Sequence, residues 1–155
     1  MLKSIEGNFD DPEVHKLLTK HFVELRAASP EGSAHVLDIP GLKVPSIKFW
    51  SLYNNDQLMG CGALKFLDKG HGEFKSIRIH DNFRKKGHGA IVINHLISEA
   101  KKLDIKRLII ETGAGDFFIP ARKLFKSCGF EPCEPFAHYK EDINSVYLTK
   151  LIATD

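Results

Sequence analysis

The stretch FRKKGHGA, residues 83–90, places three positive charges and two glycines directly before a predicted helix. The first N–H groups of a helix have no intrahelical partners, and together they carry about half a positive charge. Glycines let these groups turn inward and let a ligand approach the backbone closely. The pattern predicts an anion site, most often for phosphate, and a loop that only turns the chain is the alternative. The candidate anion-binding residues are Arg84, Lys85, Lys86, Gly87, His88, Gly89 and Ala90.

The glycine spacing excludes two common phosphate-binding loops. A Walker loop requires the pattern G-x-x-x-x-G-K-[ST], which the sequence does not contain. A dinucleotide-binding fingerprint requires a third glycine three residues after Gly89, where Val92 stands instead. What remains is the pattern Arg84-x-x-Gly87-x-Gly89 between a strand and a long helix.

Hydrophobic periodicity and turn residues predict the elements that position this loop. Asp11 and Pro12 are typical of a helix start, and Gly129 is typical of a helix end. Short turns at 54–56 and 68–72 make the three middle strands antiparallel neighbours. Helices are expected over residues 12–25, 91–103 and 120–128. Strands are expected over residues 2–7, 46–53, 57–67, 72–79, 107–112 and 145–152.

This order of elements predicts a mixed α/β fold in which helices flank one sheet. We expect the sheet to begin antiparallel and to become parallel where helices intervene. Residues 29–46 contain three prolines and two glycines, so we expect a loop with one helical turn at most. The chain has 155 residues, of which 43% are hydrophobic and 27% charged, as is typical of one globular domain over 1–155.

The composition argues against several classes of function. The net charge is only +2, which does not suit bulk electrostatic binding to nucleic acid or a membrane. No apolar run approaches the roughly 18 residues of a membrane span, and the N-terminus lacks the apolar stretch of a secretory signal. Cys61, Cys128 and Cys133 form no C-x-x-C pair, which predicts reduced thiols in the cytoplasm. No cysteine or histidine spacing predicts a metal site.

The glycine loop and its flanks together resemble the GNAT superfamily of N-acetyltransferases. The superfamily signature [QR]-x-x-G-x-[GA] stands at the same strand–helix junction as Arg84, Gly87 and Gly89. The segment GEFKSIRIHDNFRKKGHGAIVINHLISEAKK is similar to its strand–loop–helix core, and RLIIETG and PARKLFKSCGF resemble the strand and helix that follow. The resemblance covers most of the chain. It implies the GNAT-like sheet, antiparallel in its N-terminal part, parallel at a central splay and flanked by helices.

The resemblance also implies how acetyl-CoA binds as co-substrate, with no metal. Residues 84–90 would hold the pyrophosphate through backbone N–H groups, so that His88 contributes its backbone. The preceding strand would lie beside the pantetheine arm, at Ile77, Arg78 and Ile79. A bulge in this strand would splay the sheet and open a slot for the thioester. Backbone N–H groups of the same strand would polarise the acetyl carbonyl.

Acetyl transfer to an amine also requires a base. An alkyl amine with a pKa near 10.4 is only about 0.04% neutral at pH 7, and only the neutral form attacks. Glu73 stands eleven residues before Arg84, at the place of the general base in many members of the superfamily. We predict Glu73 as the base, and the alternative is a solvated glutamate at the start of a strand.

The position of the usual acid departs from the pattern that the resemblance implies. The common helix sequence Asn-x-x-Ala-x-x-Leu-Tyr reads Phe118-x-x-Ala121-x-x-Leu124-Phe125 here, and Phe125 cannot protonate the departing thiolate. Tyr139 is the candidate replacement, and an ordinary surface or core aromatic is the alternative. Weaker candidates for an acceptor pocket are His35, Trp50, His138 and Asn144.

The predicted function is transfer of an acetyl group from acetyl-CoA to a primary amine, most simply of a small molecule. A CoA-binding sensor or interaction module without catalysis is the alternative, which Phe118 and Phe125 support. Nucleic-acid binding through Arg84–Lys86 and Lys101-Lys102 is a weaker hypothesis, because no aromatic residues are interleaved for base stacking. The resemblance also allows a homodimer, since the last strands of this fold often pair between subunits.

Overall fold

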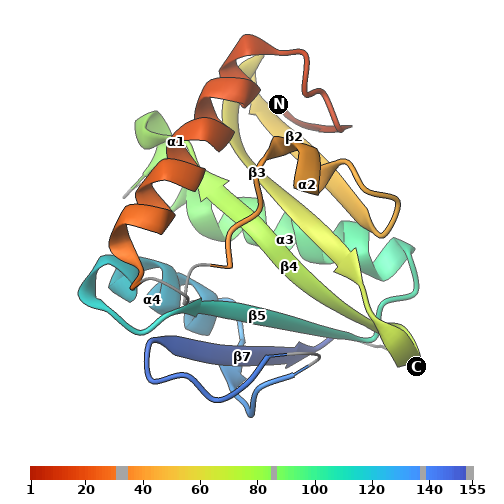
Figure 1. Ribbon diagram of the computed structural model, residues 1–155. Coiled ribbons are helices and arrows are strands. Elements are labelled where there is room, and N and C mark those ends of the chain that lie inside the picture. The colour runs from red at the N-terminus through yellow and green to blue at the C-terminus, as the bar shows by residue number, and fades with distance from the viewer. Residues whose placement is uncertain (31–34, 85–86, 137–138, 153–155) are drawn as a thin grey trace.

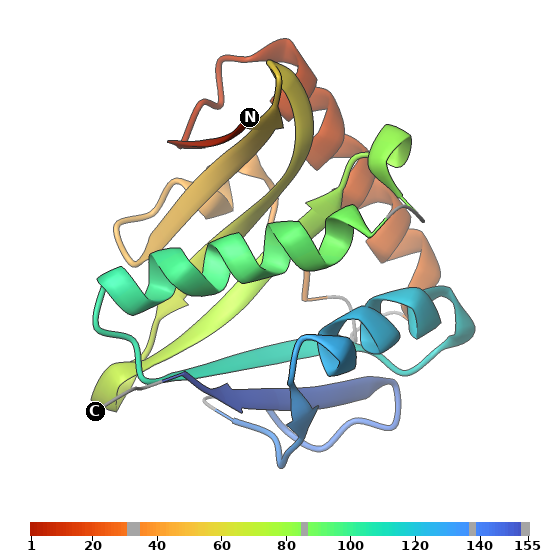
Figure 2. The ribbon, with the colours of Figure 1, turned by 180° about the vertical axis from the view of Figure 1, so that it is seen from behind.

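The computed structural model describes residues 1–30, 35–84, 87–136 and 139–152. In this part of the chain seven strands form one sheet in the order β1-β2-β3-β4-β5-β7-β6. The helices α1 and α2 lie on one face of the sheet, and α3 and α4 lie on the other (Figures 1 and 2). The strands are β1 (Leu2–Glu6), β2 (Ile47–Asn54), β3 (Gln57–Phe66), β4 (His71–Ile79), β5 (Arg107–Gly113), β6 (Glu131–Pro132) and β7 (Ser145–Leu151). The helices are α1 (Pro12–Ala28), α2 (Ile39–Leu42), α3 (His88–Lys102) and α4 (Ile119–Ser127), with short 3₁₀ turns η1 (Asp68–Gly70), η2 (Asp81–Phe83) and η3 (Asp116–Phe118).

Local sequence signals account for the ends of these elements. The Asp11 side chain caps α1 by accepting a 2.9 Å hydrogen bond from the backbone N–H of Glu13. At the C-terminal end of α4, Gly129 has a φ of +95°, a conformation that glycine adopts without a Cβ clash. Asn55 and Asp56 both have positive φ between β2 and β3, as a tight two-residue hairpin turn requires. The predicted helix start at Asp11 and Pro12, the helix end at Gly129 and the hairpin turn at 54–56 are therefore confirmed, whereas α1 runs to Ala28 and α3 begins earlier than expected, at His88.

The sheet confirms the predicted mixed architecture and corrects one part of its topology. Strands β1 to β4 are antiparallel neighbours, and β4 and β5 pair in parallel across α3. The expectation that the sheet becomes parallel wherever a helix intervenes is wrong for β5 and β7, which pair antiparallel. The reason is that the unpredicted strand β6 follows α4, and β7 returns antiparallel to β6 and inserts between β6 and β5.

Strand β4 contains a bulge and then separates from β5. Its register against β3 shifts between Cys61 and Ala63, and Ser76 has a φ of +54° at this point. Pairing with β5 ends at Phe74, which faces Ile110, so the remaining residues of both strands diverge. In Figure 1, β4 and β5 lie together at the lower right and separate toward the left. The bulge and the splay that the family resemblance implied are both present.

Two apolar clusters, one on each face, hold the diverging strands in place. On the α3 face, Leu64 and Phe74 pack with Leu96 in the larger cluster. On the α1 face, Ala63 and Cys61 pack with Leu18 in the smaller cluster. Because side chains of a strand alternate between faces, residues 73 and 75 of β4 point away from Phe74, toward the α1 face.

Candidate active site

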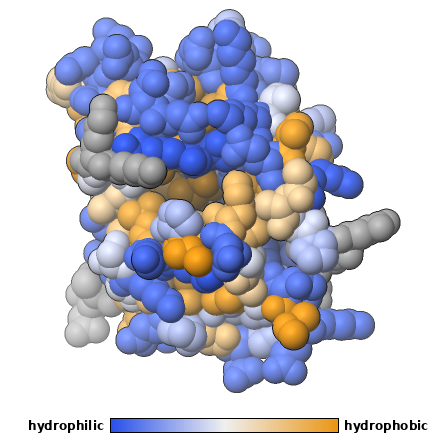
Figure 3. Space-filling model, turned by 90° about the vertical axis from the view of Figure 1, so that its left-hand side faces the viewer, coloured by the Kyte–Doolittle hydropathy of each residue, from blue (hydrophilic) through white to orange (hydrophobic). Residues whose placement is uncertain are grey.

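The split between β4 and β5 forms a cavity of about 600 Å³. Residues from both sides of the sheet line it, among them Leu25 and Glu73 from the α1 face and Leu124 from α4. Figure 3 views the side onto which the split opens and shows a hollow with hydrophobic residues in and below it and hydrophilic residues above it. A long apolar molecule with a polar end can therefore pass from one face of the sheet to the other within a single cavity.

The predicted anion site lies at one mouth of this cavity. Gly87 is the N-cap of α3 and has a φ of +80°, and a Cβ placed there would meet no atom within 4 Å. Among the described residues, none crowds Gly87 at the start of this 15-residue helix, and helix starts of this kind bind anions. Gly87, Gly89, Ala90 and Arg84 line the cavity, and His88 begins the helix. Lys85 and Lys86 lie outside the described residues.

Gly89 also has a packing role that the sequence did not suggest. A Cβ at this position would lie 2.7 Å from Cδ2 of Leu124 on α4. The absence of a side chain at Gly89 therefore lets α3 and α4 pack closely. This role is separate from any space that the glycine leaves for a ligand. A substitution at Gly89 disturbs helix packing and cannot by itself report on phosphate binding.

The three β4 residues predicted to accompany the pantetheine arm divide between the two faces. The side chains of Ile77 and Ile79 pack against the apolar cluster beneath α3, which leaves their backbone groups at the split. The side chain of Arg78 is 4% exposed and reaches toward α1, where its Nη2 donates to Oε1 of Glu24 at 2.9 Å. All three residues line the cavity, and Arg78 also ties β4 to α1.

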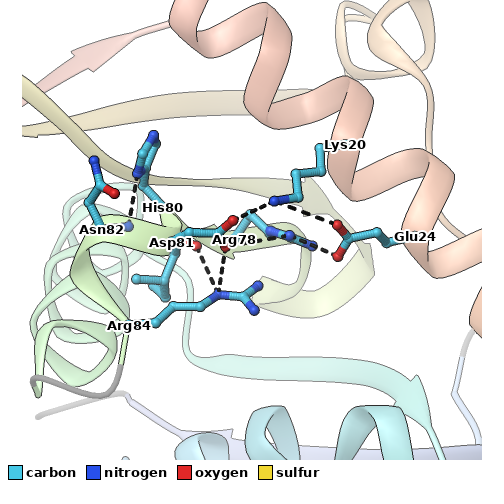
Figure 4. A network of polar contacts seen from close by, with 8 residues as sticks. Lys20, Glu24, Arg78, His80, Asp81, Asn82 and Arg84 are labelled. Carbon is cyan, nitrogen blue, oxygen red and sulfur yellow. Dashed lines mark hydrogen bonds and ion pairs between the residues drawn. The ribbon is translucent and has the colours of Figure 1, made fainter.

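Charged groups connect α1 to the loop before α3 (Figure 4). Asp81 of η2 accepts a hydrogen bond from Lys20 of α1, and its Oδ1 lies 3.4 Å from Nε of Arg84. The hydrogen bond from Lys20 holds the pKa of Asp81 below its usual value. Arg84 also donates from Nε to the carbonyl oxygen of Ile79 at 3.3 Å. These contacts place a guanidinium group at the mouth of the cavity, beside the open helix start.

Glu73 lies deep in the cavity and is 2% exposed, so the alternative of a solvated glutamate is wrong. The Tyr139 hydroxyl donates to its Oε2 at 2.8 Å, and the ammonium of Lys75 lies 3.3 Å from the same oxygen. Lys75 Nζ is also 3.2 Å from the Tyr139 hydroxyl. The two residues predicted as base and acid are thus in direct contact, and Lys75 joins both.

Tyr139 belongs to a cluster of rings on the α1 side of the split. Its ring lies 5.0 Å from that of His35, 5.1 Å from Phe136 and 5.7 Å from Tyr147, measured between centroids. Burial, followed by the nearby Glu73, raises the pKa of Tyr139 well above its usual value. The phenol therefore keeps its proton, and that proton is directed at Glu73.

Sequence reasoning missed Glu111 and Lys75, which complete this polar group. Burial raises the pKa of Glu111 to about 7, and the charge of Lys75 acts in the opposite direction. Glu111 lies on β5 one residue beyond the last pair with β4, and it lines the cavity. Strand alternation could have found Lys75, because it stands two residues after Glu73 and so shares its face.

His21 of α1 is a second unpredicted residue of the cavity wall. It is 6% exposed, and within the described part of the chain its Nδ1 has no hydrogen-bond partner. Burial, and then the charges of Arg78 and Arg84, lower its pKa to about 3. The His21 side chain is therefore uncharged near neutral pH. It forms part of the cavity wall and is influenced by the guanidinium groups of Arg78 and Arg84.

The other sequence candidates have mixed outcomes. Phe118 and Phe125 are both buried at the cavity wall. Because both are phenylalanines, neither can donate a proton. His35 lines the cavity, whereas Trp50 packs in the apolar cluster and His138 lies outside the described residues. Asn144 is near the end of β5, where its carbonyl oxygen accepts from the N–H of Ala114 at 2.9 Å.

Several further features concern only the residues that the structure describes. All three cysteines are among them and carry free thiols. No cluster of three histidine, cysteine or acidic side chains suited to a metal ion occurs within the described ranges. Over the same part of the chain, no helix combines the length and apolar character needed to cross a membrane.

Comparison with known proteins gives a consistent result. Residues 12–130 match the model of the acetyltransferase (GNAT) family. The chain is 47% identical over 138 residues to the N-acetyltransferase YsnE of Bacillus subtilis (strain 168), covering 89% of this chain and 91% of that protein. It is 38% identical over 138 residues to the N-acetyltransferase YedL of Escherichia coli (strain K12), covering 89% of this chain and 87% of the relative.

Solved structures share the fold at lower identity. A Bacillus subtilis acetyltransferase crystallised in complex with CoA superposes with a TM-score of 0.71 at 23% identity. The match covers 97% of this chain and 99% of that one. The arrangement of seven strands with one parallel pair is therefore that of known acetyltransferases.

Proposed function

Because the chain belongs to the acetyltransferase (GNAT) family, we propose that it transfers an acetyl group from acetyl-CoA to a primary amine of a small molecule. One observation carries this proposal. A single cavity joins an open helix start on the α3 side of the sheet to a buried carboxylate on the α1 side. Acetyl transfer needs both ends, because the thioester and the amine must meet while the amine loses a proton.

The residues at the α3 end fit the phosphate groups of acetyl-CoA. The N–H groups that begin α3 would donate hydrogen bonds to the pyrophosphate, and Arg84 would add charge beside it. The open space around Gly87 is the observation that supports this fit. When bound, acetyl-CoA supplies an activated acetyl thioester. Beyond Phe74, β4 still pairs with β3 but no longer with β5, and the backbone on this open side would hold the arm that carries the acetyl group.

At the other end of the cavity, Glu73 would accept the proton of the amine. An incoming ammonium must lose a proton before its nitrogen attacks the acetyl carbon. Glu73 is buried in the cavity with one oxygen held by Tyr139 and Lys75, which fixes the direction of its carboxylate. Glu111 and His35, which both line the cavity, would face a cationic acceptor.

Tyr139 is best placed to orient Glu73. Its proton points at Oε2 of Glu73, and the raised pKa of the phenol makes donation to a thiolate, whose pKa is near 8.5, more unfavourable. The thiolate can depart without a dedicated acid and take its proton from water. The prediction that Tyr139 acts as the acid remains open to the pH profile described in the Discussion.

Release of free thiol from acetyl-CoA, measured across a panel of primary amines, tests the proposal. We expect thiol release that depends on both substrates and that saturates with the amine. Binding of acetyl-CoA by calorimetry without thiol release for any amine would favour the sensor module, which Phe118 and Phe125 support. Absence of acetyl-CoA binding would overturn both readings.

A further inference from the structure

The amine closest to the candidate base belongs to the protein itself. Lys75 Nζ donates a hydrogen bond to Oε2 of Glu73 at 3.3 Å, so the amine and the candidate base are direct partners. Among the described residues that line the cavity, Lys75 is the only lysine. Its side chain is 11% exposed, so the ammonium is inside the cavity and away from the outer surface.

The position of Lys75 along β4 places it where an acetyl group would arrive. Phe74 is the last residue of β4 that pairs with β5, so Lys75 is the first residue of the split. Its side chain and that of Glu73 both point to the α1 face of the sheet. This is the face from which an acceptor amine would enter. The Tyr139 hydroxyl, at 3.2 Å, holds the nitrogen from a second direction.

We propose that Lys75 is an internal acetyl acceptor, so that the protein acetylates its own Lys75 side chain within the cavity. This inference rests on the proposed function, because it uses the same thioester and the same base. The new bond joins Lys75 Nζ to the acetyl carbon, and the bond between that carbon and the CoA sulfur breaks with its electron pair on sulfur. Lys75 loses two protons overall: one passes through Glu73 to solvent and the other ends on the CoA sulfur.

Acetylation of Lys75 would change the cavity in two ways. It would remove the positive charge that now lies beside Glu73, and it would fill part of the acceptor space with an uncharged amide. The electrostatic influence of Lys75 on Glu111 is an independent sign that its charge acts on the cavity. The modified protein would therefore differ from the unmodified one in how it receives a cationic acceptor.

The test is mass spectrometry of the full chain after incubation with acetyl-CoA that carries a trideuterated acetyl group. We expect one labelled acetyl group per chain, at Lys75, at a fractional rate that does not depend on protein concentration. Glu73→Gln should slow the labelling by about 100-fold, as expected for loss of a general base. Lys75→Arg should abolish it while keeping the positive charge.

Lys48 provides a matched control in the same spectra. It lies on β2, 3.4 Å from Oε1 of Glu6, and so forms a similar lysine–glutamate pair outside the cavity. Labelling of Lys48 as fast as Lys75, or equal labelling of Lys75 in heat-unfolded protein, would mean nonenzymatic chemistry and would overturn the inference. This comparison within the wild-type protein does not depend on the folding of any variant.

Calorimetry and thiol release on the same preparation separate the two proposals. If acetyl-CoA binds and amines are acetylated while Lys75 stays unlabelled, the internal transfer is wrong and the proposed function stands. If acetyl-CoA does not bind and Lys75 stays unlabelled, both fail.

Discussion

The Tyr139 hydroxyl donates a 2.8 Å hydrogen bond to Oε2 of Glu73, although the two residues are 66 positions apart in the sequence. The bond crosses from the loop before β7 to the centre of the sheet, at the point where β4 and β5 separate. A carboxylate held in this way has a fixed orientation toward the cavity, which a general base requires.

Removal of the basic carboxylate oxygen should impair catalysis without weakening the binding of acetyl-CoA. We expect Glu73→Gln to lower kcat/KM by roughly 100-fold or more, because the amine loses its proton acceptor. The dissociation constant of acetyl-CoA, measured by calorimetry, should barely change. Glu6→Gln is the control, since Glu6 pairs with Lys48 on the outside of the sheet. Wild-type turnover of Glu73→Gln between pH 6 and 9 would exclude Glu73 as the base.

Substitution of the phenol separates orientation from proton donation. We expect Tyr139→Phe to lower kcat/KM, because Oε2 of Glu73 loses its 2.8 Å donor, while the alkaline limb of the pH profile stays in place. Phe125→Tyr in the same background should restore no activity. Loss of the alkaline limb together with rescue by Phe125→Tyr would show instead that Tyr139 protonates the thiolate.

The helix start can be tested by changing the ligand. We expect acetyl-CoA to bind at least tenfold more tightly than S-acetylpantetheine, which lacks the pyrophosphate, a difference of about 1.4 kcal/mol. Arg84→Gln should reduce this preference, because it should weaken the binding of acetyl-CoA and leave that of S-acetylpantetheine unchanged. Calorimetry of both ligands provides the measurement, and Lys102→Gln, at the far end of α3, is the control. Equal affinities would leave the glycine loop as a simple turn.

The buried His21 should make the protein less stable in acid. Its pKa is about 3 in the folded protein and near 6.5 when unfolded, so only the unfolded chain binds this proton between those values. Stability is lost as pH falls from 6.5 toward 3, by at most about 1.4 kcal/mol per pH unit from this group. Urea unfolding of His21→Gln should show a correspondingly shallower loss between pH 6.5 and 4.5. Identical slopes would contradict a neutral, buried His21.

The raised pKa of Glu111 should produce the opposite dependence. The folded protein holds this proton up to about pH 7, whereas the unfolded chain releases it near pH 4.5. Stability from this group is therefore present below 4.5 and is lost as pH rises through 7. Glu111→Gln should remove this loss in the same unfolding experiments. A variant that destabilises equally at pH 5 and pH 8 would contradict the raised pKa.

Local signals in the sequence predicted most of the fold. The cap at Asp11, the glycine after α4 and the turn at Asn55 and Asp56 depend on neighbouring residues, so they can be identified without the tertiary structure. The insertion of β7 between β5 and β6 could not be predicted in this way. It depends on pairing between distant segments, and β6 is only two residues long.

The candidate site shows the same division between local and distant information. The anion loop and Glu73 stand in one continuous segment with a recognisable pattern. The contact of Glu73 with Tyr139 and the partial burial of Glu111 arise only when β4, β5 and the loop before β7 come together. His21 was missed because histidine on an amphipathic helix looks polar, although it stands seven residues after the buried Val14 on the same face.

The place of β7 within the sheet has a consequence for synthesis of the chain. Until residues 145–151 have left the ribosome, one edge of β5 has no neighbour and its N–H and C=O groups remain open to other polypeptides. The apolar cluster that includes Leu148 is also incomplete until then. The nascent chain therefore exposes an unpaired strand edge until β7 has been made. A chaperone that shields unpaired strands would act on this protein before β7 pairs with β5.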